Sequence, residues 1–370
     1  MKIGILTLPL HTNYGGILQA YALQTVLERM GHQTVVFNHK RKYSLPAWRL
    51  PLSYTKRVIK KYVLGRKDIR IFAEQHQNKE YAIISQHTQR FIDTYIHTYN
   101  VESFKSLKAA DFDAIVVGSD QVWRPKYFEP MFGEGIDNAF LSFAHNWKIK
   151  RISYAASFGT EDWEYTDEYT RLCSELLGRF DAITVREESG VRLCKDKLGA
   201  DAEHVLDPTM LLSKDDYMKL FDVASTPESP GNLLVYVLDD SPEKTEMINK
   251  ISKEKELVPF RVNAKAKGAD ATVEERIQPP VEAWLRGFHD AEFVVTDSFH
   301  ACVFSIIFGK PFVVIGNKER GMARFESLLK MFGLEDCLIM SDKYNTVKCC
   351  DCKKLIKYQE HSLKQLSQAL

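Results

Sequence analysis

The first forty residues constrain the fold most, because they form a complete strand–helix–strand pattern. Residues 3–8 are a short apolar run, and a turn with two adjacent glycines follows at 11–16. Over 17–30 apolar side chains recur on one broad face, which predicts a helix that ends at glycine. The β-branched and aromatic run 34–37 predicts the next strand. Two strands joined through a helix indicate a parallel sheet with helices on both faces.

Strands of the same kind recur along the chain, most of them followed directly by polar residues or glycine. We expect them at 113–117, 151–156, 181–185, 204–206, 233–238, 293–296 and 311–315, with a further short one within 257–262. Helical patterns alternate with the later strands at 242–256, 280–291, 300–308 and 320–332. The polar, proline-bearing stretch near 213–230 predicts a linker.

This alternation predicts an α/β protein with two Rossmann-like, doubly wound domains that face each other across a cleft. We place the first domain at 1–212, with a basic insertion at 40–100, and the second at 213–345. A tail helix follows at 346–370. In open α/β sheets ligands bind outside the carboxyl ends of the strands, so the residues just after each strand are the candidates for the site.

Composition and charge exclude several classes of protein. The 50 Lys and Arg balance 49 Asp and Glu, and a net charge of +1 gives no overall attraction to nucleic acid. No apolar run reaches the roughly 18 residues of a membrane helix, and the first run is too short for a signal peptide. Seven cysteines, an odd number, indicate a reducing cytoplasm. Because Cys349, Cys350 and Cys352 lack the paired spacing of a zinc site, we expect no metal.

Residues 40–70 form a basic segment that interrupts the alternation. The segment holds eleven Lys or Arg and a single acid, Asp68. Aromatic and apolar side chains such as Tyr54 and Tyr62 recur near helical spacing between the basic ones, which is typical of a helix on a membrane surface. A solvated charged helix explains the pattern equally well. Nucleic-acid binding ranks third, because no recognised motif accompanies the charge.

Two motifs in the first half follow predicted strands and carry candidate binding groups. Asn13-Tyr14-Gly15-Gly16 lets backbone approach a ligand closely at a helix start that attracts anions, although a plain tight turn explains it slightly better. Gly118-Ser119-Asp120-Gln121, followed by Trp123, combines polar groups with an aromatic plate that suits a sugar. An Asp cap on the next helix, with the Trp in the core, is an equal alternative.

Two further strand ends carry groups suited to an anion. Arg186 directly follows a buried strand, where a fixed guanidinium suits a carboxylate or phosphate, and an ion pair with Glu187 or Glu188 is the alternative. The stretch 296–300 places polar groups and the His300 imidazole where a strand gives way to an apolar helix. The helix start supplies N–H donors, so an anion there would lie within reach of the imidazole. A capped helix with a satisfied core histidine is nearly as good an explanation.

Taken together, these stretches resemble the polysaccharide pyruvyl transferase family. The resemblance covers about residues 1–320 and rests on the order and spacing of several short motifs. The motifs are Thr12-Asn13-Tyr14-Gly15-Gly16 with Leu18-Gln19-Ala20, Gly118-Ser119-Asp120-Gln121-Val122-Trp123, Ser153-Tyr154-Ala155-Ala156-Ser157-Phe158-Gly159, Val185-Arg186-Glu187-Glu188-Ser189, Leu206-Asp207-Pro208-Thr209, and Thr296-Asp297-Ser298-Phe299-His300 with Gly309-Lys310-Pro311.

The resemblance implies a GT-B-like fold, a site between the domains and no cofactor. It implies an enzyme that moves the enolpyruvyl group of phosphoenolpyruvate onto a sugar of a cell-surface polysaccharide precursor, forming a pyruvate ketal and releasing phosphate. By position, His300 and Arg186 would be catalytic, and Asp297, Ser298 and Phe299 would bind the donor. The acceptor would contact Asn13, Tyr14, Gly15, Gly16, Gly118, Ser119, Asp120 and Gln121.

One position departs from the family pattern. Some members carry an arginine two residues before the histidine, where this chain has Ser298. Three explanations stay open: Lys318, Arg320 or Arg324 supplies the missing cation, the donor is a different one, or this subgroup has a different chemistry. The expected partners are phosphoenolpyruvate and a sugar acceptor on a lipid carrier, with a peripheral membrane contact through 40–70 at the inner face of the membrane. The alternatives are a glycosyltransferase with a nucleotide-sugar donor and a non-catalytic glycan-binding protein.

Overall fold

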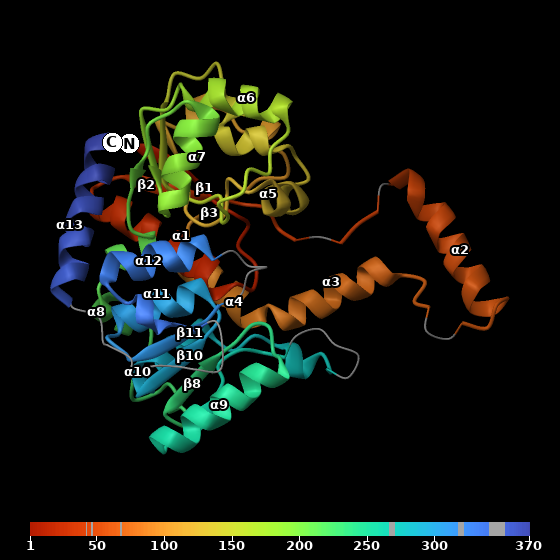
Figure 1. The fold of residues 1–370 in the computed structure, drawn as a ribbon. Coiled ribbons are helices and arrows are strands. Elements are labelled where there is room, and N and C mark those ends of the chain that lie inside the picture. Colours follow the sequence, from red (N-terminus) through yellow and green to blue (C-terminus); the bar gives the residue numbers. More distant parts are fainter. Residues whose placement is uncertain (42, 46, 67–68, 266–270, 317–321, 340–351) are drawn as a thin grey trace.

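The computed structural model describes residues 1–41, 43–45, 47–66, 69–265, 271–316, 322–339 and 352–370. Within these residues the chain forms two parallel β-sheets, each flanked by helices (Figure 1). The predicted α/β class with two Rossmann-like units is therefore confirmed.

The N-terminal sheet has seven strands in the described part of the chain, in the order β3-β2-β1-β4-β5-β6-β7. Their bounds are β1 Lys2–Leu6, β2 Gln33–Asn38, β3 Thr98–Asn100, β4 Ala114–Val117, β5 Lys150–Ala156, β6 Ala182–Val185 and β7 Glu203–His204. All neighbours pair in parallel, so the carboxyl ends lie at one edge. The strand order reverses between β1 and β4, which is where such sheets open a crevice for ligands.

The C-terminal sheet has five strands within the described residues, in the order β12-β11-β10-β8-β9. Their bounds are β8 Leu233–Tyr236, β9 Pro259–Phe260, β10 Phe293–Thr296, β11 Phe312–Ile315 and β12 Leu338–Ile339. These strands also pair in parallel. β8, β10 and β11 are fully buried, as their unbroken Val, Ile, Leu and Phe runs predict.

Helices cover both sheets and supply the elements that carry the site. They are α1 Tyr14–Arg29, α2 Leu50–Tyr62, α3 Ala73–Ile84, α4 Gln86–Tyr95, α5 Pro125–Phe132, α6 Asp167–Leu177, α7 Glu188–Leu198, α8 Lys214–Met218, α9 Pro242–Lys255, α10 Val281–Asp290, α11 Phe299–Ile307, α12 Ala323–Phe332 and α13 Cys352–Ala369. The helices predicted from the first and the later sequence patterns are α1, α9, α10, α11 and α12. None of the helices in the described residues is long and apolar enough to cross a membrane.

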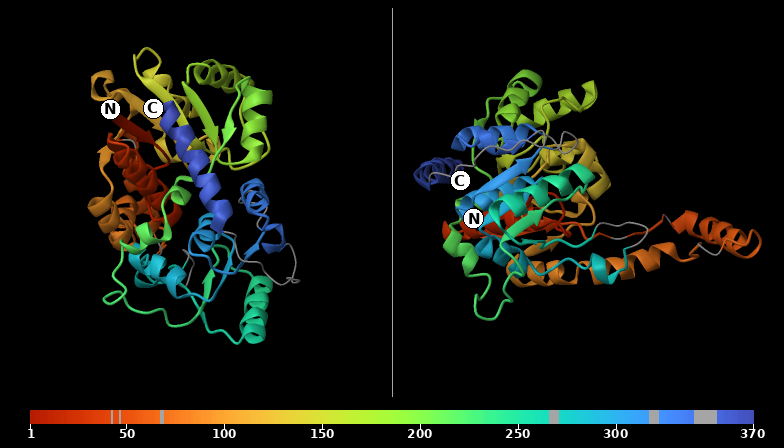
Figure 2. Two further views of the ribbon diagram at one scale, coloured as in Figure 1. Left: turned by 90° about the vertical axis from the view of Figure 1, so that its left-hand side faces the viewer. Right: turned by 60° about the horizontal axis from the view of Figure 1, so that its bottom comes forward.

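α2 stands away from the body as an arm, and α3 leads back from it (Figure 1; Figure 2, right). Arg57 of α2 forms a two-bonded ion pair with Glu74 of α3, at 2.6 and 2.7 Å. α4 belongs to the body, because Phe91 is fully buried against α1. β3 extends the sheet beside β2. The last part of the segment expected as an insertion, 40–100, therefore packs with the N-terminal domain.

The two domains share one apolar core. Tyr14 of α1 stacks on Trp284 of α10, with ring centroids 5.5 Å apart, and its hydroxyl donates to the Pro279 carbonyl at 2.7 Å. Phe304 of α11 packs edge-on against Trp284 at 4.8 Å. The cleft expected between the domains is therefore closed along α1, α10 and α11.

The last helix returns to the N-terminal domain. The Leu206 amide donates to Ser362 Oγ of α13 at 3.0 Å. Lys150 Nζ donates to the carbonyls of Ala369 and Leu370, at 3.2 and 2.8 Å. The two termini lie near each other on the surface in both orientations (Figures 1 and 2). This helix thus ties the end of the chain to the first sheet.

Candidate active site

Two residues at the carboxyl edge of the N-terminal sheet form a buried ion pair. Arg186 follows β6, and Asp207 lies shortly beyond β7. Arg186 Nη1 donates to Asp207 Oδ2 at 2.7 Å, and its Nη2 lies 3.5 Å from Asp120 Oδ1. Both members of the pair are almost fully buried. Arg186 is thus placed where its strand-end position predicted, and its ion-pair partners are Asp207 and Asp120, not the adjacent glutamates.

Asp207 is the hub of the cluster. Its Oδ1 accepts from the amide and the hydroxyl of Thr209 at 3.0 and 2.6 Å, and its Oδ2 accepts from Ser119 Oγ at 3.1 Å. Burial acts to raise the pKa of this carboxyl, but Arg186 and His300 hold it down at about 2. The carboxylate is therefore ionised throughout the physiological range. It lies in the Leu206–Thr209 motif, yet sequence reasoning gave it no role.

His300 reaches this cluster from the other domain. It is the second residue of α11, and its Nε2 lies 3.8 Å from Asp207 Oδ2, beyond hydrogen-bond range. On its other side the ring touches the first turn of α1, where a Cβ added to Gly15 would lie 2.6 Å from His300 Cβ and closer still to the ring. Burial is the main cause that lowers the pKa of His300, and Asp207 and Asp120 only partly oppose it. The imidazole is therefore neutral near pH 7.

A second cation joins the group from α12. The Arg324 guanidinium lies 5.3 Å from the centre of the Phe299 ring, and that of Arg186 lies 4.7 Å from the same ring. Burial lowers the pKa of Arg324 to about 10, which leaves it charged at neutral pH. Lys318 and Arg320, the other candidates for a compensating cation, lie outside the described residues. Two guanidinium groups thus flank one aromatic ring beside His300.

The side chains of Asp297 and Ser298 differ in their hydrogen bonds within the protein. Asp297 accepts from the amides of Leu238 and Asp239, at 2.7 and 3.2 Å, and from Lys244 Nζ at 2.7 Å. These bonds fasten the loop after β8, so its carboxylate is engaged away from the cluster. Ser298 precedes α11 and its side chain makes no capping bond. The capped helix that was the alternative at this stretch is therefore not what forms.

Several residues expected to touch the acceptor are occupied inside the protein. The Tyr14 ring lies in the domain interface, as described above. The Ser119 hydroxyl donates to the Ala155 carbonyl as well as to Asp207, and its amide donates to Gln19 Oε1 at 3.0 Å. Gln121 Oε1 accepts from Arg124 at 3.1 Å. Each of these side chains has protein partners that hold the site together, and sugar contact at them stays a prediction.

Gly118 and Trp123 likewise serve the scaffold. Gly118 has φ of 128°, which favours glycine, and a Cβ there would collide with the Tyr154 carbonyl. Trp123 is completely buried and stacks on Phe140 at 4.9 Å, so the Trp belongs to the core and offers no plate to a sugar. Of the two explanations weighed for this motif, the structure supports the core position of the Trp.

The remaining acceptor candidates lie near one another at the start of α1. Asn13 is exposed and caps α1, with its Oδ1 accepting from the Gly15 amide at 3.1 Å. A Cβ on Gly16 would lie 3.5 Å from Asn13 Nδ2 and 3.6 Å from Asp120 Oδ2, so both side chains approach this glycine. Asn13 also lines a cavity of about 760 Å³ between the domains, whose other wall includes Tyr236 and Asn263.

A second buried carboxylate was missed by sequence reasoning. Glu187 Oε1 accepts from Ser157 Oγ, from the Phe158 amide and from the Gly159 amide, at 2.9 to 3.2 Å. These bonds fix the loop after β5. The only sequence signal was an acid two residues after a buried strand, which local pattern cannot distinguish from a surface charge. Within the described residues no three His, Cys, Asp or Glu side chains are grouped to hold a metal, and Cys349 and Cys350 lie outside those residues.

Two Rossmann-like domains meet around a buried cluster of two arginines, an aspartate and a histidine, and this arrangement defines the chain as an α/β protein of two facing parallel sheets. Sequence comparison identifies the family: residues 13–319 match the sequence model of the polysaccharide pyruvyl transferase family. The chain belongs to this family, whose members are transferases. A search of curated proteins found no match.

Solved structures with a similar course of the chain are only remotely related. The UDP-GlcNAc 2-epimerase of Methanocaldococcus jannaschii is 14% identical, with a TM-score of 0.48 over 98% of this chain and 93% of that one. The Neisseria meningitidis UDP-GlcNAc 2-epimerase bound to UDP-GlcNAc is 12% identical, at 0.46 over 99% and 94%. An Arabidopsis thaliana protein complexed with UDP-L-rhamnose is 11% identical, at 0.47 over 99% and 93%. Structural similarity this remote gives no information about the substrate of this chain.

Proposed function

We propose that this protein transfers the enolpyruvyl group of phosphoenolpyruvate onto a sugar of a cell-surface polysaccharide precursor, forming a pyruvate ketal and releasing phosphate. The observation that carries the proposal is the convergence of Arg186, Arg324 and His300 around Phe299. Phosphoenolpyruvate is a small, multiply charged anion, and fixed guanidinium groups suit both its carboxylate and its phosphate. Family membership supports the class of reaction.

Two buried nitrogens favour a ligand at this place. Arg186 Nε and His300 Nε2 are buried, and neither has a hydrogen-bond partner within the described residues. An unpaired buried polar group costs about 1–3 kcal/mol, and an oxygen of the donor substrate at Arg186 Nε together with a sugar hydroxyl at His300 Nε2 would recover that cost. The start of α11 at Ser298 adds N–H groups that attract an anion. Arg324 supplies the positive charge that some family members have from an arginine at the position of Ser298.

The reaction requires that two hydroxyl protons leave the sugar and that one proton reaches the methylene carbon. A neutral His300 accepts the proton of the first hydroxyl, and the imidazolium then delivers it to the methylene carbon as the first C–O bond forms. Phosphate departs with the electrons of its C–O bond, and the second hydroxyl closes the ketal. The second proton leaves with phosphate, whose charge Arg186 and Arg324 stabilise. Asn13, Gly16 and Asp120 would face the sugar.

Three variants test the assignment. His300→Ala and Arg186→Lys should each lower ketal formation by at least about a hundredfold, because general acid–base groups and oriented charges contribute that much. Since Arg186 is buried in an ion pair, Arg324→Gln provides a second cation variant that leaves the Asp207 pair intact. Phosphate release from phosphoenolpyruvate is the assay, with circular dichroism to verify folding. Folded variants that form the ketal at wild-type rate would refute the proposal.

A nucleotide-sugar donor is the competing possibility for the same site. Thermal shift measurements distinguish the two donors. We expect phosphoenolpyruvate to stabilise the wild-type protein and to have a much smaller effect on Arg324→Gln. Stabilisation by a nucleotide, with none by phosphoenolpyruvate, would favour a glycosyltransferase. Sugar binding without turnover of either donor would favour a non-catalytic glycan-binding protein.

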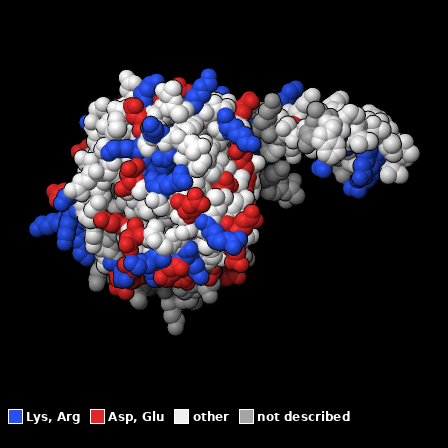
Figure 3. Space-filling model, turned by 90° about the horizontal axis from the view of Figure 1, so that it is seen from above, with Lys and Arg blue, Asp and Glu red and all other residues white. Residues whose placement is uncertain are grey.

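We further propose that the arm holds the protein at the cytoplasmic face of an anionic membrane. Apolar side chains on and beside α2 are at least 64% exposed: Trp48, Leu52, Tyr62, Val63 and Leu64. α2 carries basic but no acidic residues, and Figure 3 shows the arm mostly white with blue groups while the body has mixed charge. Exposed apolar and basic groups on one helix are typical of interfacial binding.

Vesicle flotation tests this contact. Val63→Glu places a charge on the apolar face of the arm, where Val63 is 74% exposed. Val258→Glu is the matched control, the same change at a site on the C-terminal domain that is 58% exposed. We expect wild type and the control to float with anionic vesicles in low salt and the arm variant to stay behind. Equal flotation of all three would contradict the role of the arm.

A further inference from the structure

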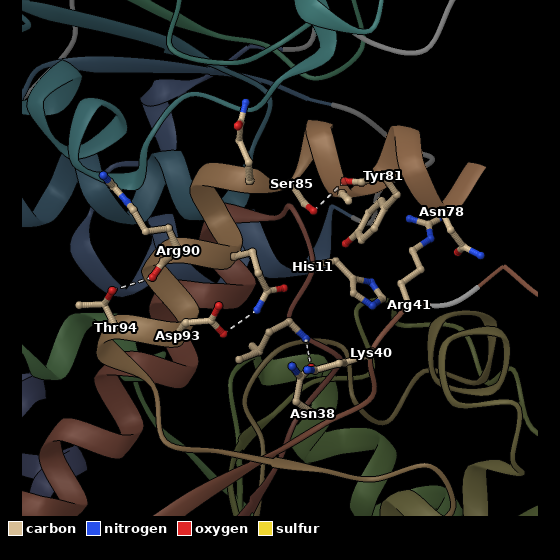
Figure 4. Close-up of a pocket in the computed structure, with 14 residues that line it drawn as sticks. His11, Asn38, Lys40, Arg41, Asn78, Tyr81, Ser85, Arg90, Asp93 and Thr94 are labelled. Atoms are coloured by element: carbon tan, nitrogen blue, oxygen red, sulfur yellow. Dashed lines mark hydrogen bonds between the residues drawn. The ribbon is translucent and has the colours of Figure 1, made fainter. Parts of the chain in front are cut away.

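A second cavity, of about 580 Å³, lies at the base of the arm (Figure 4). Its walls come from the loop after β1, the loop after β2 and the helices α3 and α4. His11 and Arg41 meet Tyr81 on one side, while Arg90 and Asp93 lie on the other. The cavity is on the same edge of the N-terminal sheet as the cluster described above. No part of the reaction proposed above uses it.

The cavity carries more positive than negative charge. Three cations line it, Lys40, Arg41 and Arg90, against the single carboxylate of Asp93. Arg90 is committed to Glu282 Oε1 at 2.7 Å. Lys40 and Arg41 take part in no ion pair within the described residues. Two positive charges are therefore left to a ligand.

The Arg41 guanidinium is oriented by aromatic rings. It lies 5.0 Å from the centre of the Tyr43 ring and 5.4 Å from that of Tyr81. Stacking of this kind covers the faces of a guanidinium and leaves its N–H edge free to donate. Tyr81 also packs edge-on against His11, with centroids 6.1 Å apart. Burial and Arg41 lower the pKa of His11 to about 4, so its ring is neutral near pH 7, and its Nε2 lies 3.4 Å from the His39 carbonyl, to which it donates.

The cavity adjoins the space between the domains. His11 and Asn13 are two residues apart on one loop, a span of at most about 7 Å, and Asn13 lines the interdomain cavity. On the far side, the Gln278 amide donates to the Ile84 carbonyl at 3.0 Å, and Gln278 also lines the interdomain cavity. Ser85, the next residue after Ile84, lines the basic cavity. A ligand with its anionic end in the basic cavity can thus extend toward Asn13.

We propose that this basic cavity binds the phosphate or diphosphate through which the acceptor sugar is attached to its carrier. The inference rests on the proposed function for the presence of a sugar acceptor, and it assigns the place in the fold where the phosphate of the carrier binds. Lys40 and Arg41 provide charged donors for phosphate oxygens. Both a lipid carrier and a nucleotide carrier bring this chemistry. α3 forms one wall of the cavity and continues to the exposed arm, a course that suits a lipid carrier.

Binding of inorganic pyrophosphate tests the cavity without requiring turnover. The variant is Lys40→Gln with Arg41→Gln, two exposed positions whose change leaves the core intact. Lys250→Gln, at an exposed position on α9, is the control for the loss of surface charge. Binding is measured by titration calorimetry in the presence of saturating phosphoenolpyruvate. Phosphoenolpyruvate then fills the proposed donor site, so the measured binding of pyrophosphate reports on the basic cavity. We expect the double variant to bind pyrophosphate at least about tenfold more weakly than wild type, since charge-assisted bonds contribute that much.

Equal pyrophosphate affinity in wild type and the double variant would overturn the proposal, as would an equal loss in Lys250→Gln. Titration with a nucleoside diphosphate sugar and with neutral vesicles carrying an isoprenyl diphosphate sugar then identifies the source. If the double variant binds one of these two ligands more weakly than wild type does, the result supports the site and identifies the carrier. If the double variant binds both ligands as tightly as wild type does, the proposal is overturned. Phosphoenolpyruvate affinity should be the same in all three proteins. If the proposed transfer itself fails, wild type shows no turnover while the pyrophosphate result still decides the cavity.

Discussion

Gly15→Ala is the substitution that most directly tests the position of His300. The added Cβ would lie 2.6 Å from His300 Cβ and closer still to the ring, whereas ordinary van der Waals contact begins near 3.4 Å. The imidazole must therefore move by roughly 1 Å or more. Gly15 lies in the first turn of α1, where alanine is favoured over glycine by up to about 1 kcal/mol. Overpacking costs about 1–3 kcal/mol, so the net effect on stability is small.

The effect on activity is much larger than the effect on stability. A misplacement of about 1 Å lowers the rate of catalysis on the order of a hundredfold. We expect that loss in kcat for phosphate release from phosphoenolpyruvate, with a melting temperature within a few degrees of wild type. Gly178→Ala, at the end of α6 and away from the cluster, is the control, because its Cβ would meet the carbonyls of Glu175 and Ser174 at ordinary distances of 3.4 to 3.6 Å. Full activity of Gly15→Ala would refute the placement of the imidazole against α1 or its part in the reaction.

Asp207→Asn removes the charge that offsets buried Arg186, and we expect about 3 kcal/mol less stability in urea unfolding and loss of phosphate release. A variant as stable and active as wild type would contradict this. The pKa of His11 is about 4 in the fold against 6.5 in the unfolded chain. The unfolded chain binds more protons between these values, so the free energy of unfolding falls as pH drops from 6.5 to 4. His11→Gln should flatten this part of the curve, and an unchanged slope would count against it. Tyr14→Phe removes the bond to the Pro279 carbonyl, and about 1 kcal/mol should be lost with kcat retained; a loss of kcat would show that the hydroxyl serves more than packing.

Local pattern was sufficient for the order of the longer strands and for where polar groups would lie. The run before Arg186 is a strand because its side chains are β-branched and apolar, and its end places the arginine at the edge of the sheet. The same reasoning located His300 at the start of α11. β3 and β12 were missed, because strands of three and two residues carry too little pattern. The arm was anticipated as a basic helix, but not its projection from the body.

Side-chain partners were beyond the reach of local pattern. Tyr14 and Asn13 are neighbours in sequence, yet one is buried against Trp284 and the other is exposed. Asp297 and Asp207 both follow apolar runs, but the first fastens a loop while the second joins Arg186 to His300. Their roles depend on contacts with residues tens of positions away.

The sequence by itself determined that this chain builds two parallel sheets and which residues lie at their carboxyl edges, because periodicity and turn residues act over a few positions. Only the tertiary structure decided which of those residues meet. Asp207 and His300 come from different domains, and the packing of α1 against α10 and α11 brings the two within 3.8 Å. The same packing buries Tyr14, sets Arg324 beside Phe299 and leaves Lys40 and Arg41 facing a cavity. Such contacts depend on how apolar faces fit together across the whole chain, which no short stretch of sequence specifies.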